Sequence, residues 1–221
     1  MEGMLSPARA ASPAANDDWV AVFQQRGVWQ LTRDAVERWV KRNAAFFGML
    51  SRAVPRGSKV LELGCGPGRH ALGAATLGYQ VVGIDIAPQI VDQAQANQRA
   101  AAPECNALFR VGDMFNLDSV VPMGTFQAIT HGGVMEHLDS AESIREALRD
   151  QLEFAPNIVF DVPFDSAKNR RLFARDEIFR QLWTPDQWLH EVLAGLTVIE
   201  ARTELHEEDN MTDDLVVALG R

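Results

Sequence analysis

The sequence predicts an α/β protein, a Rossmann-like three-layer sandwich around a mostly parallel, seven-stranded sheet with an antiparallel C-terminal strand. Short apolar runs alternate with helical segments of about 10–15 residues, which is typical of a parallel sheet covered on both faces. A glycine-rich turn at 64–68 joins the first strand to a helix. The last two strand-like runs, 196–202 and 214–219, have no helix between them, which favours an antiparallel return.

Composition limits the classes of function. The 221 residues, 47% of them hydrophobic, suit one domain with a full core. A formal net charge of −9 disfavours a nucleic-acid partner, because such proteins carry basic faces. Cys65 and Cys105 form no disulfide framework, so we expect free thiols and a cytoplasmic location. No apolar run approaches the roughly 20 residues that span a bilayer, so no membrane partner is expected.

The N-terminal region divides into two expected parts. Residues 1–16 are rich in Ala, Ser and Pro and lack the apolar core of a signal peptide, which predicts a flexible tail. Apolar residues then recur at helical spacing, so 17–57 is expected to form two helices that act as cap elements. Residues 58–221 hold the sheet and form the main domain.

The first strand, 59–63, runs directly into the turn Gly64-Cys65-Gly66-Pro67-Gly68, and a helix over 68–77 follows. A glycine turn at this point lets a ligand lie against the backbone, because no Cβ blocks its approach. The second strand, 80–84, ends on Asp85, whose carboxylate can accept hydrogen bonds from both hydroxyls of a ribose. Strand, turn, helix, strand and acid together predict a nucleoside-bearing cofactor.

The glycine spacing indicates which cofactor this is. The dinucleotide fingerprint G-x-G-x-x-G fails because Arg69 occupies its third glycine position, so a nucleotide-dependent oxidoreductase is disfavoured. The pattern is instead G-x-G-x-G, with Glu62 two residues before the first glycine. It resembles the first motif of class I S-adenosylmethionine-dependent methyltransferases of the small-molecule type. That resemblance implies S-adenosyl-L-methionine as the cofactor.

Three further motifs carry the same resemblance, which runs from about Val60 to the C-terminus. Residues 81–86 resemble the ribose-binding strand, and 109–114 resemble the third strand, whose acid faces the adenine amino group and whose next side chain covers the ring. Residues 126–138 resemble the fourth strand and its loop. The cofactor-binding residues that the resemblance implies are Glu62, Gly64, Cys65, Gly66, Gly68, Asp85, Ile86, Asp113, Met114 and His131.

The remaining elements continue the alternation. Helices are expected over 87–101 and 140–154, the second capped by Ser140, and the fifth strand over 158–161. Residues 183–188 begin a further helix, with a Thr cap and a Pro in the first turn.

The candidate catalytic residues are His131, Glu136 and His137, at and after the end of the fourth strand, where the resemblance places the reacting methyl group. The sulfonium already carries its leaving group, so alignment of the acceptor can supply most of the rate. A general base is needed only if the acceptor must lose a proton, and either histidine could then serve. A buried structural histidine is the alternative for each. No metal is expected, because no acidic cluster follows this strand.

Two segments are expected to shape the acceptor site, because the sheet and its turn bind only the cofactor. The aromatic N-terminal region suggests a lid that excludes water, and the segment after the fifth strand is the second candidate. Alternatively the aromatics pack outer helices, and the basic stretch 164–173 is a solvated helix face instead of a site for an anionic acceptor. The candidate acceptor residues are Trp19, Phe23, Trp29, Phe164, Arg171 and Trp183.

The sequence therefore predicts transfer of the methyl group of S-adenosylmethionine to an O or N atom, less readily a C or S atom, of a small-molecule acceptor. Two alternatives stay open. One is an RNA or protein methyltransferase on the same scaffold, and the other is a catalytically inactive, cofactor-binding partner subunit. An oligomer is also left open.

Overall fold

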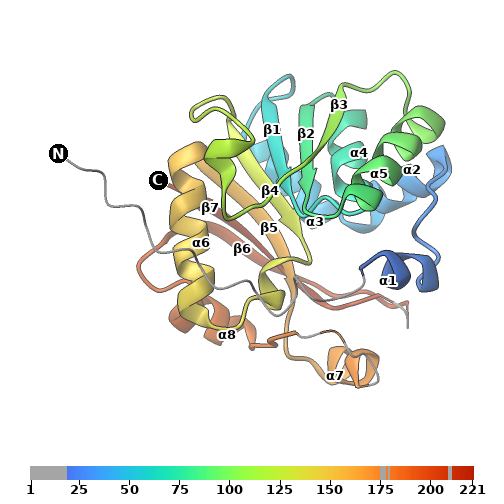
Figure 1. Cartoon of the computed structure of the whole chain (residues 1–221). Helices are drawn as coiled ribbons and strands as arrows, with labels where there is room; N and C mark the ends of the chain where they lie inside the picture. Colours follow the sequence, from blue (N-terminus) through green and yellow to red (C-terminus); the bar gives the residue numbers. More distant parts are fainter. Residues whose placement is uncertain (1–18, 175–177, 179, 209–210) are drawn as a thin grey trace.

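The computed structural model describes residues 19–174, 178, 180–208 and 211–221. The tail predicted over 1–16 lies outside these residues. The chain folds into one sheet with helices on both faces (Figure 1).

The sheet of the described residues has seven strands in the order β3-β2-β1-β4-β5-β7-β6. The first five are parallel, and β7 lies antiparallel between β5 and β6. This confirms the predicted fold class, including the reversed C-terminal strand. The strands are β1 Lys59–Leu63, β2 Gln80–Asp85, β3 Ala107–Val111, β4 Ala128–Gly132, β5 Asn157–Pro163, β6 Thr197–Glu204 and β7 Asp214–Gly220.

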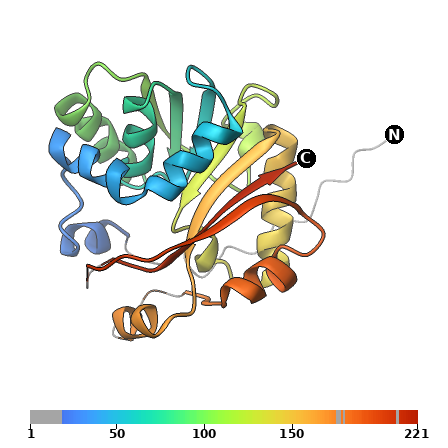
Figure 2. The ribbon, with the colours of Figure 1, turned by 180° about the vertical axis from the view of Figure 1, so that it is seen from behind.

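Helices cover the two faces of the sheet unequally. The helices α2, α3, α4 and α5 pack on one face, whereas α6 and the π-helical turn η4 pack on the other (Figures 1 and 2). The helices are α1 Trp19–Gln25, α2 Arg33–Arg42, α3 Ala44–Ala53, α4 Arg69–Thr76, α5 Pro88–Ala101, α6 Ala141–Phe154, α7 Ala167–Phe173 and α8 Pro185–Gln187, with shorter turns η2 Leu117–Ser119, η3 Met135–His137 and η4 Trp188–Val192.

The predicted pair of N-terminal helices is a set of three. Asn43 divides the second, because its backbone and side-chain N–H groups both donate to the carbonyl of Trp39 and close α2 before α3 starts. Helix α3 buries Phe46, Phe47 and Leu50 against the sheet and so belongs to its covering layer. Helix α1 has no buried residue and reaches over the carboxyl edge of the strands (Figure 1).

The core alternates between the two faces of each strand, as a sheet with two covered faces requires. On β5, Val159 packs toward α3, and its neighbours Ile158 and Phe160 pack toward α6. Helix α6 begins as predicted, because the Ser140 hydroxyl accepts from the Ser143 N–H. These layers hold the carboxyl ends of the parallel strands at one edge.

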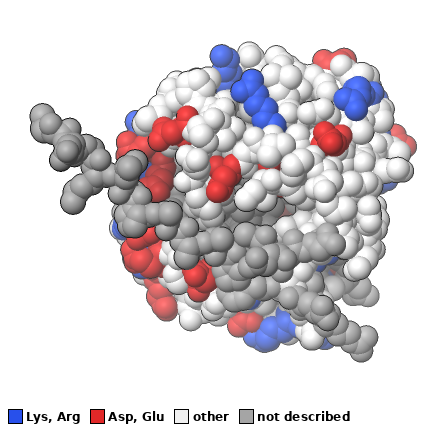
Figure 3. Space-filling model, in the orientation of Figure 1, with Lys and Arg blue, Asp and Glu red and all other residues white. Residues whose placement is uncertain are grey.

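Acidic side chains gather on the surface beside α6 (Figure 3). The exposed acids of this helix are Glu142, Glu146, Asp150 and Glu153. None of the helices that the structure describes is long and apolar enough to cross a membrane.

Candidate active site

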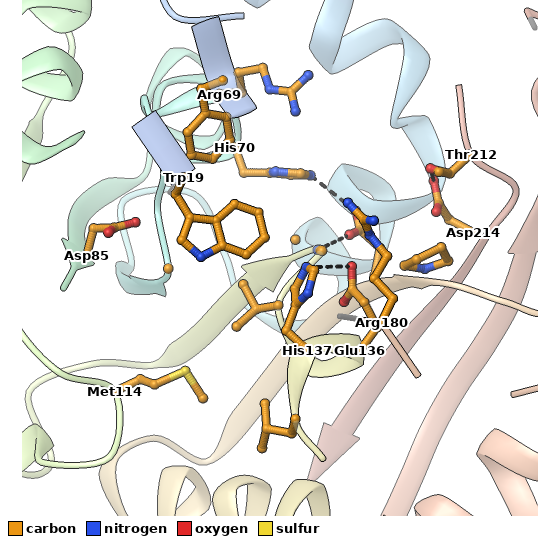
Figure 4. A pocket seen from close by; sticks show the side chains of 18 of the residues that line it. Trp19, Arg69, His70, Asp85, Met114, Glu136, His137, Arg180, Thr212 and Asp214 are labelled. Atoms are coloured by element: carbon orange, nitrogen blue, oxygen red, sulfur yellow. Dashed lines mark hydrogen bonds and ion pairs between the residues drawn. The ribbon is translucent and has the colours of Figure 1, made fainter. Parts of the chain in front are cut away.

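A cavity of about 320 Å³ opens at the carboxyl edge of β1, β2, β4 and β5. Its walls come from α1, α2, the glycine turn, the start of α4, the ends of β2 and β5, the loops after β3 and β4, the segment after β5 and the start of β7 (Figure 4). In an open α/β sheet, ligands bind in the crevice outside the carboxyl ends of the strands. The cavity therefore lies where the fold class places a ligand.

The glycine turn cannot carry other side chains. Gly64, Gly66 and Gly68 have φ angles of +63°, +52° and +96°, a region that L side chains rarely adopt. A Cβ on Gly64 would lie 2.8 Å from Val134 Cγ2, and one on Gly66 would lie 2.9 Å from Phe23 Cζ. The backbone of the turn is thus approached closely by the loop after β4 and by α1.

Asp85 lies at the end of β2, as predicted, and lines the cavity. Its Oδ2 accepts from the Gly66 N–H at 3.0 Å and its Oδ1 from the Ala87 N–H at 3.1 Å. Burial raises the pKa of this carboxyl, and these backbone donors oppose the rise. Ile86 lines the same wall and is 56% exposed, so an apolar side chain is available beside the acid.

Asp113 and Met114 follow β3 and also line the cavity. The Asp113 Oδ1 accepts from the Phe115 N–H at 2.9 Å, which folds the loop back on itself. Figure 4 places Met114 on the side of the cavity that holds Asp85. Two acids and two apolar side chains from neighbouring strand ends therefore form one wall.

Glu62 is buried on β1, next to the turn, and does not line the cavity. Burial, followed by the charges of Asp161 and Asp85, raises the pKa of its carboxyl well above the usual value. Its Oε2 has no hydrogen-bond partner among the described residues. Cys65, Gly66 and Gly68 are likewise absent from the lining, and Gly64 is the residue of the turn that borders the cavity.

The loop after β4 brings Glu136 and His137 into the cavity wall. The Glu136 Oε1 lies 3.6 Å from the His137 Nε2, and the Glu136 Oε2 has no hydrogen-bond partner within the part of the chain that is described. Burial raises the pKa of Glu136 to about 8. The Trp19 ring meets the His137 ring edge-on, with centroids 4.7 Å apart, so α1 covers this loop.

His131 lies outside the cavity wall, although the sequence predicted it as a site residue. Its ring points toward α6, where its Nε2 lies 3.2 Å from the Gln151 Oε1, and it stacks on Phe160 with centroids 5.2 Å apart. The side chain is fully buried and does not line the cavity. Burial lowers its pKa to about 4. Successive residues of β4 face opposite sides of the sheet, and the side chain at position 131 faces the side that α6 covers.

A second histidine–carboxylate pair lies in the cavity wall, and the sequence did not indicate it. The His70 Nε2, from α4, lies 3.1 Å from the Asp161 Oδ2 at the end of β5. The Asp161 Oδ1 accepts from the Gly133 N–H at 3.0 Å. The His70 ring packs on Gly132, where a Cβ would lie only 2.3 Å from the His70 Cε1. The only sequence signal for His70 was its position two residues after the last glycine of the turn.

The sequence analysis also did not identify three arginines that line the cavity. Arg69 lies over the Trp39 ring at 3.9 Å from its centroid, and Arg180 lies over Phe173 at 4.2 Å. Both line the cavity, as does Arg26. Burial lowers the pKa of Arg69 to about 10, while the charge of Asp161 opposes the fall. Figure 4 shows Arg69 and Arg180 on the side of the cavity that holds His70, away from Asp85 and Met114.

Among the candidate acceptor residues, Trp19 and Phe23 line the cavity and the other four do not. Phe164 is a core residue, and Trp183 packs edge-on against the buried Trp188 ring at 5.1 Å. Arg171 is exposed on α7. Trp29 lies in the loop after α1, where its carbonyl accepts from Asn97.

Fold and site together are those of a ligand-binding α/β protein, and the cavity continues beyond the wall expected to hold the cofactor. Within the described residues no group of three or more His, Cys, Asp and Glu side chains could hold a metal ion.

Known proteins resemble this chain in sequence and in fold. Residues 60–154 match the model of a methyltransferase domain. The ubiquinone biosynthesis O-methyltransferase of Xanthomonas axonopodis pv. citri (strain 306) is 31% identical over 103 residues, which cover 47% of this chain and 42% of that enzyme. The ribosomal protein L11 methyltransferase of Thermus thermophilus is 35% identical over 100 residues, which cover 45% of this chain and 37% of that enzyme. The chain thus matches less than half of each relative.

A solved structure extends the similarity of fold to nearly the whole chain. Magnesium protoporphyrin IX methyltransferase from Synechocystis PCC 6803, with bound SAH, has a TM-score of 0.67 at 14% identity, and covers 91% of this chain and 94% of that one. Residues 60–154 are therefore similar to methyltransferase domains, and the chain has the Rossmann-like fold of S-adenosylmethionine-dependent methyltransferases.

Proposed function

We propose that the protein transfers the methyl group of S-adenosylmethionine to an O or N atom of a small-molecule acceptor. The main support is one continuous cavity, which joins the Asp85 and Asp113 wall to a second wall that carries His70, Glu136 and Asp161. One wall suits a nucleoside, and the other presents titratable groups to a second ligand.

The residues present fit the cofactor. Asp85 would accept from the ribose hydroxyls, while Asp113 and Met114 would meet the edge and face of the adenine. The turn that begins at Gly64 would lie against the methionine end, where no Cβ intervenes. Glu62 lies behind this turn and not in the cavity wall, so its buried Oε2, which has no partner among the described residues, would meet the ligand through water or the turn.

The bound cofactor would supply a methyl group already attached to a positively charged leaving group. The protein then has to orient the acceptor and exclude water. Trp19 and Phe23 of α1 would close the cavity from outside. His137 lies against the Trp19 ring, and Glu136 and His137 would form part of the acceptor wall.

The size of the cavity favours a small acceptor, since about 320 Å³ lies at the lower end of the usual range for ligand pockets. The net charge of −9 disfavours RNA. The similarity to a ribosomal protein methyltransferase keeps a protein acceptor as the alternative.

Two measurements test the proposal. Calorimetry should give saturable binding of S-adenosylhomocysteine and none of NAD, because the glycine spacing and strand-end acids suit the former. Methyl-tritiated S-adenosylmethionine should then pass its label to the low-molecular-weight fraction of a cell extract. Label in RNA or protein would mean that the acceptor is a macromolecule and not a small molecule. Binding without any transfer would indicate an inactive subunit, and NAD binding without S-adenosylhomocysteine binding would overturn the proposal.

A further inference from the structure

The pair His70–Asp161 combines burial with access to the cavity. His70 is 8% exposed and Asp161 is 7% exposed, yet both line the cavity. Their 3.1 Å contact joins α4 to the end of β5, two elements that are 91 residues apart in sequence. A buried charge is costly unless it is paired, so the pair has an electrostatic reason to stay together.

The surrounding contacts orient the imidazole. One Asp161 oxygen accepts from the Gly133 N–H, and the other faces the His70 Nε2. A carboxylate only accepts, so the Nε2 carries the proton and the Nδ1 is left as an acceptor. The ring packs on Gly132, and the Trp39 ring meets it edge-on with centroids 5.2 Å apart.

The other histidines of the region are less suited to take a proton from an acceptor. His131 is turned toward α6 and does not reach the cavity. His137 lies 3.6 Å from Glu136, which is longer than a hydrogen bond. Burial raises the pKa of Glu136 to about 8, so this acid is mostly protonated at neutral pH and supports an imidazolium poorly.

We propose that His70, held by Asp161, is the general base of the methyl transfer proposed above, and that the acceptor is a hydroxyl compound. The inference rests on the proposed function. The acceptor hydroxyl gives its proton to the His70 Nδ1 as its oxygen takes the methyl group. The electrons of the broken carbon–sulfur bond stay on sulfur, which becomes a neutral thioether. Asp161 stabilises the imidazolium until it releases its proton to water.

The chemistry of the acceptor explains why a base belongs here. A neutral amine already offers a lone pair to the methyl carbon, whereas a neutral hydroxyl is a weak nucleophile until it loses its proton. A base in contact with a carboxylate, next to the place where the acceptor binds, is therefore most useful for O-methylation.

Several other charged groups act on the pair and would shape its pH dependence. They come from the strands, loops and helix around it. The groups that interact electrostatically with Asp161 are Glu62, Arg69, His131, Glu136, Glu204 and Asp214.

The first test needs no acceptor. Proton NMR of the full chain with S-adenosylhomocysteine should follow the five histidines, with His70 identified by the loss of its signal in His70→Gln. Asp161→Asn should move the signals of the His70 ring, because the carboxylate that accepts from its Nε2 at 3.1 Å is replaced by an amide. A His70 ring signal that is unchanged in a folded Asp161→Asn protein would overturn the pairing.

The second test uses the extract that supplies the acceptor. At neutral pH, His70→Gln should lower the rate of label transfer by about 100-fold or more, and the deficit should shrink as pH rises and the acceptor ionises by itself. The matched control is His190→Gln, which changes an exposed histidine on η4 and should leave the rate and its pH profile intact. The dissociation constant for S-adenosylhomocysteine should change less than about threefold in both variants.

The outcomes separate the two proposals. If the wild-type chain neither binds S-adenosylhomocysteine nor transfers label, the proposed function fails. If the wild-type chain transfers label but His70→Gln keeps its rate and pH profile, or the labelled product carries its methyl group on nitrogen, the inference about His70 fails alone. Label on oxygen, together with a rate deficit in His70→Gln that shrinks as pH rises, supports it.

Discussion

Asp85 links the cofactor wall to the glycine turn. One of its oxygens holds the Gly66 N–H and the other holds the Ala87 N–H, so the side chain shapes the turn as well as facing the cavity. A substitution should therefore affect ligand affinity more than global folding, since the residue lies at a strand end.

We expect Asp85→Ala to weaken binding of S-adenosylhomocysteine by roughly 2–4 kcal/mol, because a buried ribose loses charge-assisted hydrogen bonds. Calorimetry on the folded variant measures this loss. Asp118→Ala, which removes an exposed acid from η2, serves as the control and should bind normally. Wild-type affinity in Asp85→Ala would reject the ribose assignment.

Glu136 should make stability fall as pH rises. Its pKa is raised from 4.5 to about 8 by burial, so the folded protein keeps a proton that the unfolded chain releases. Whenever the folded state binds more protons, the free energy of unfolding decreases with pH, and here the loss accumulates between about 4.5 and 8. Below this window the acid is protonated in both states.

Glu136→Gln removes that titration. The variant should gain free energy of unfolding relative to wild type by a few kcal/mol at pH 8 and by much less at pH 5. Urea unfolding at the two pH values measures the difference, and Glu153→Gln provides an exposed control on α6. An equal difference at both pH values would mean that Glu136 is ionised in the folded protein.

Individual site residues were predictable where the backbone pattern marks them. Asp85 and Asp113 lie at or just after the ends of two predicted strands, so a parallel sheet brings them to one edge. His70 and Asp161 lie 91 positions apart, and only the packing of α4 beside β5 joins them. His131 was misleading because one residue along a strand changes the face of the sheet.

At the scale of elements, α1 is the covering piece of the site. It buries none of its residues in the core, yet Phe23 lies against the glycine turn and Trp19 against His137. A helix with these contacts can be altered at little cost in stability, since its side chains meet the cavity and not the core.

The double variant Trp19→Ala, Phe23→Ala should reduce methyl transfer at least tenfold, because water enters the reaction space, while the melting temperature changes little. Deletion of residues 1–30 should have a similar effect, and cofactor affinity should persist. Label transfer and thermal unfolding measure the two effects. Gln25→Ala, an exposed site on the same helix, is the control. Normal turnover in the double variant would mean that α1 is not a lid.

Two helical glycines should respond in opposite ways to the same change. A Cβ on Gly73 of α4 would lie 2.7 Å from Phe47 Cζ and 3.0 Å from Val40 Cγ2, so Gly73→Ala should destabilise the fold by about 1–3 kcal/mol. A Cβ on Gly48 of α3 meets only the flexible end of Arg52 at 3.3 Å. Gly48→Ala should therefore stabilise by about 0.5–1 kcal/mol. Chemical denaturation measures both, and destabilisation by Gly48→Ala would contradict this account.

Elements were more predictable in the sheet than around it. Apolar runs bounded by turn residues located β1, β2 and β7 closely, because strand pattern and burial agree there. Within the segment after β5, Phe173 and Arg180 line the cavity, whereas Phe164 packs in the core and Trp183 is partly buried against it. Composition does not distinguish an aromatic that lines a cavity from one that fills the interior.

For the whole molecule, ligand binding and folding are linked through the site. The cavity gathers wall residues from both ends of the chain, from α1 to the start of β7, so it exists only when the complete sheet has formed. A ligand that binds in this cavity therefore stabilises the folded state relative to the unfolded chain.

S-adenosylhomocysteine at 100 times its dissociation constant should add about 2.7 kcal/mol to the free energy of unfolding. For a chain of this size, that corresponds to a rise in melting temperature of roughly 5–10 °C. NAD at the same concentration is the control and should leave the transition in place. A thermal scan without any shift would show that the ligand does not bind the folded chain.

The contact between His70 and Gly132 also has an evolutionary consequence. A Cβ at position 132 would lie 2.3 Å from the His70 ring, so the two positions cannot vary independently. While an imidazole is present at position 70, selection should retain glycine at position 132. A lineage that replaced the ring with a small side chain would be released from that restriction. Paired substitutions at these two sites should therefore mark the branches on which the His70–Asp161 contact was lost.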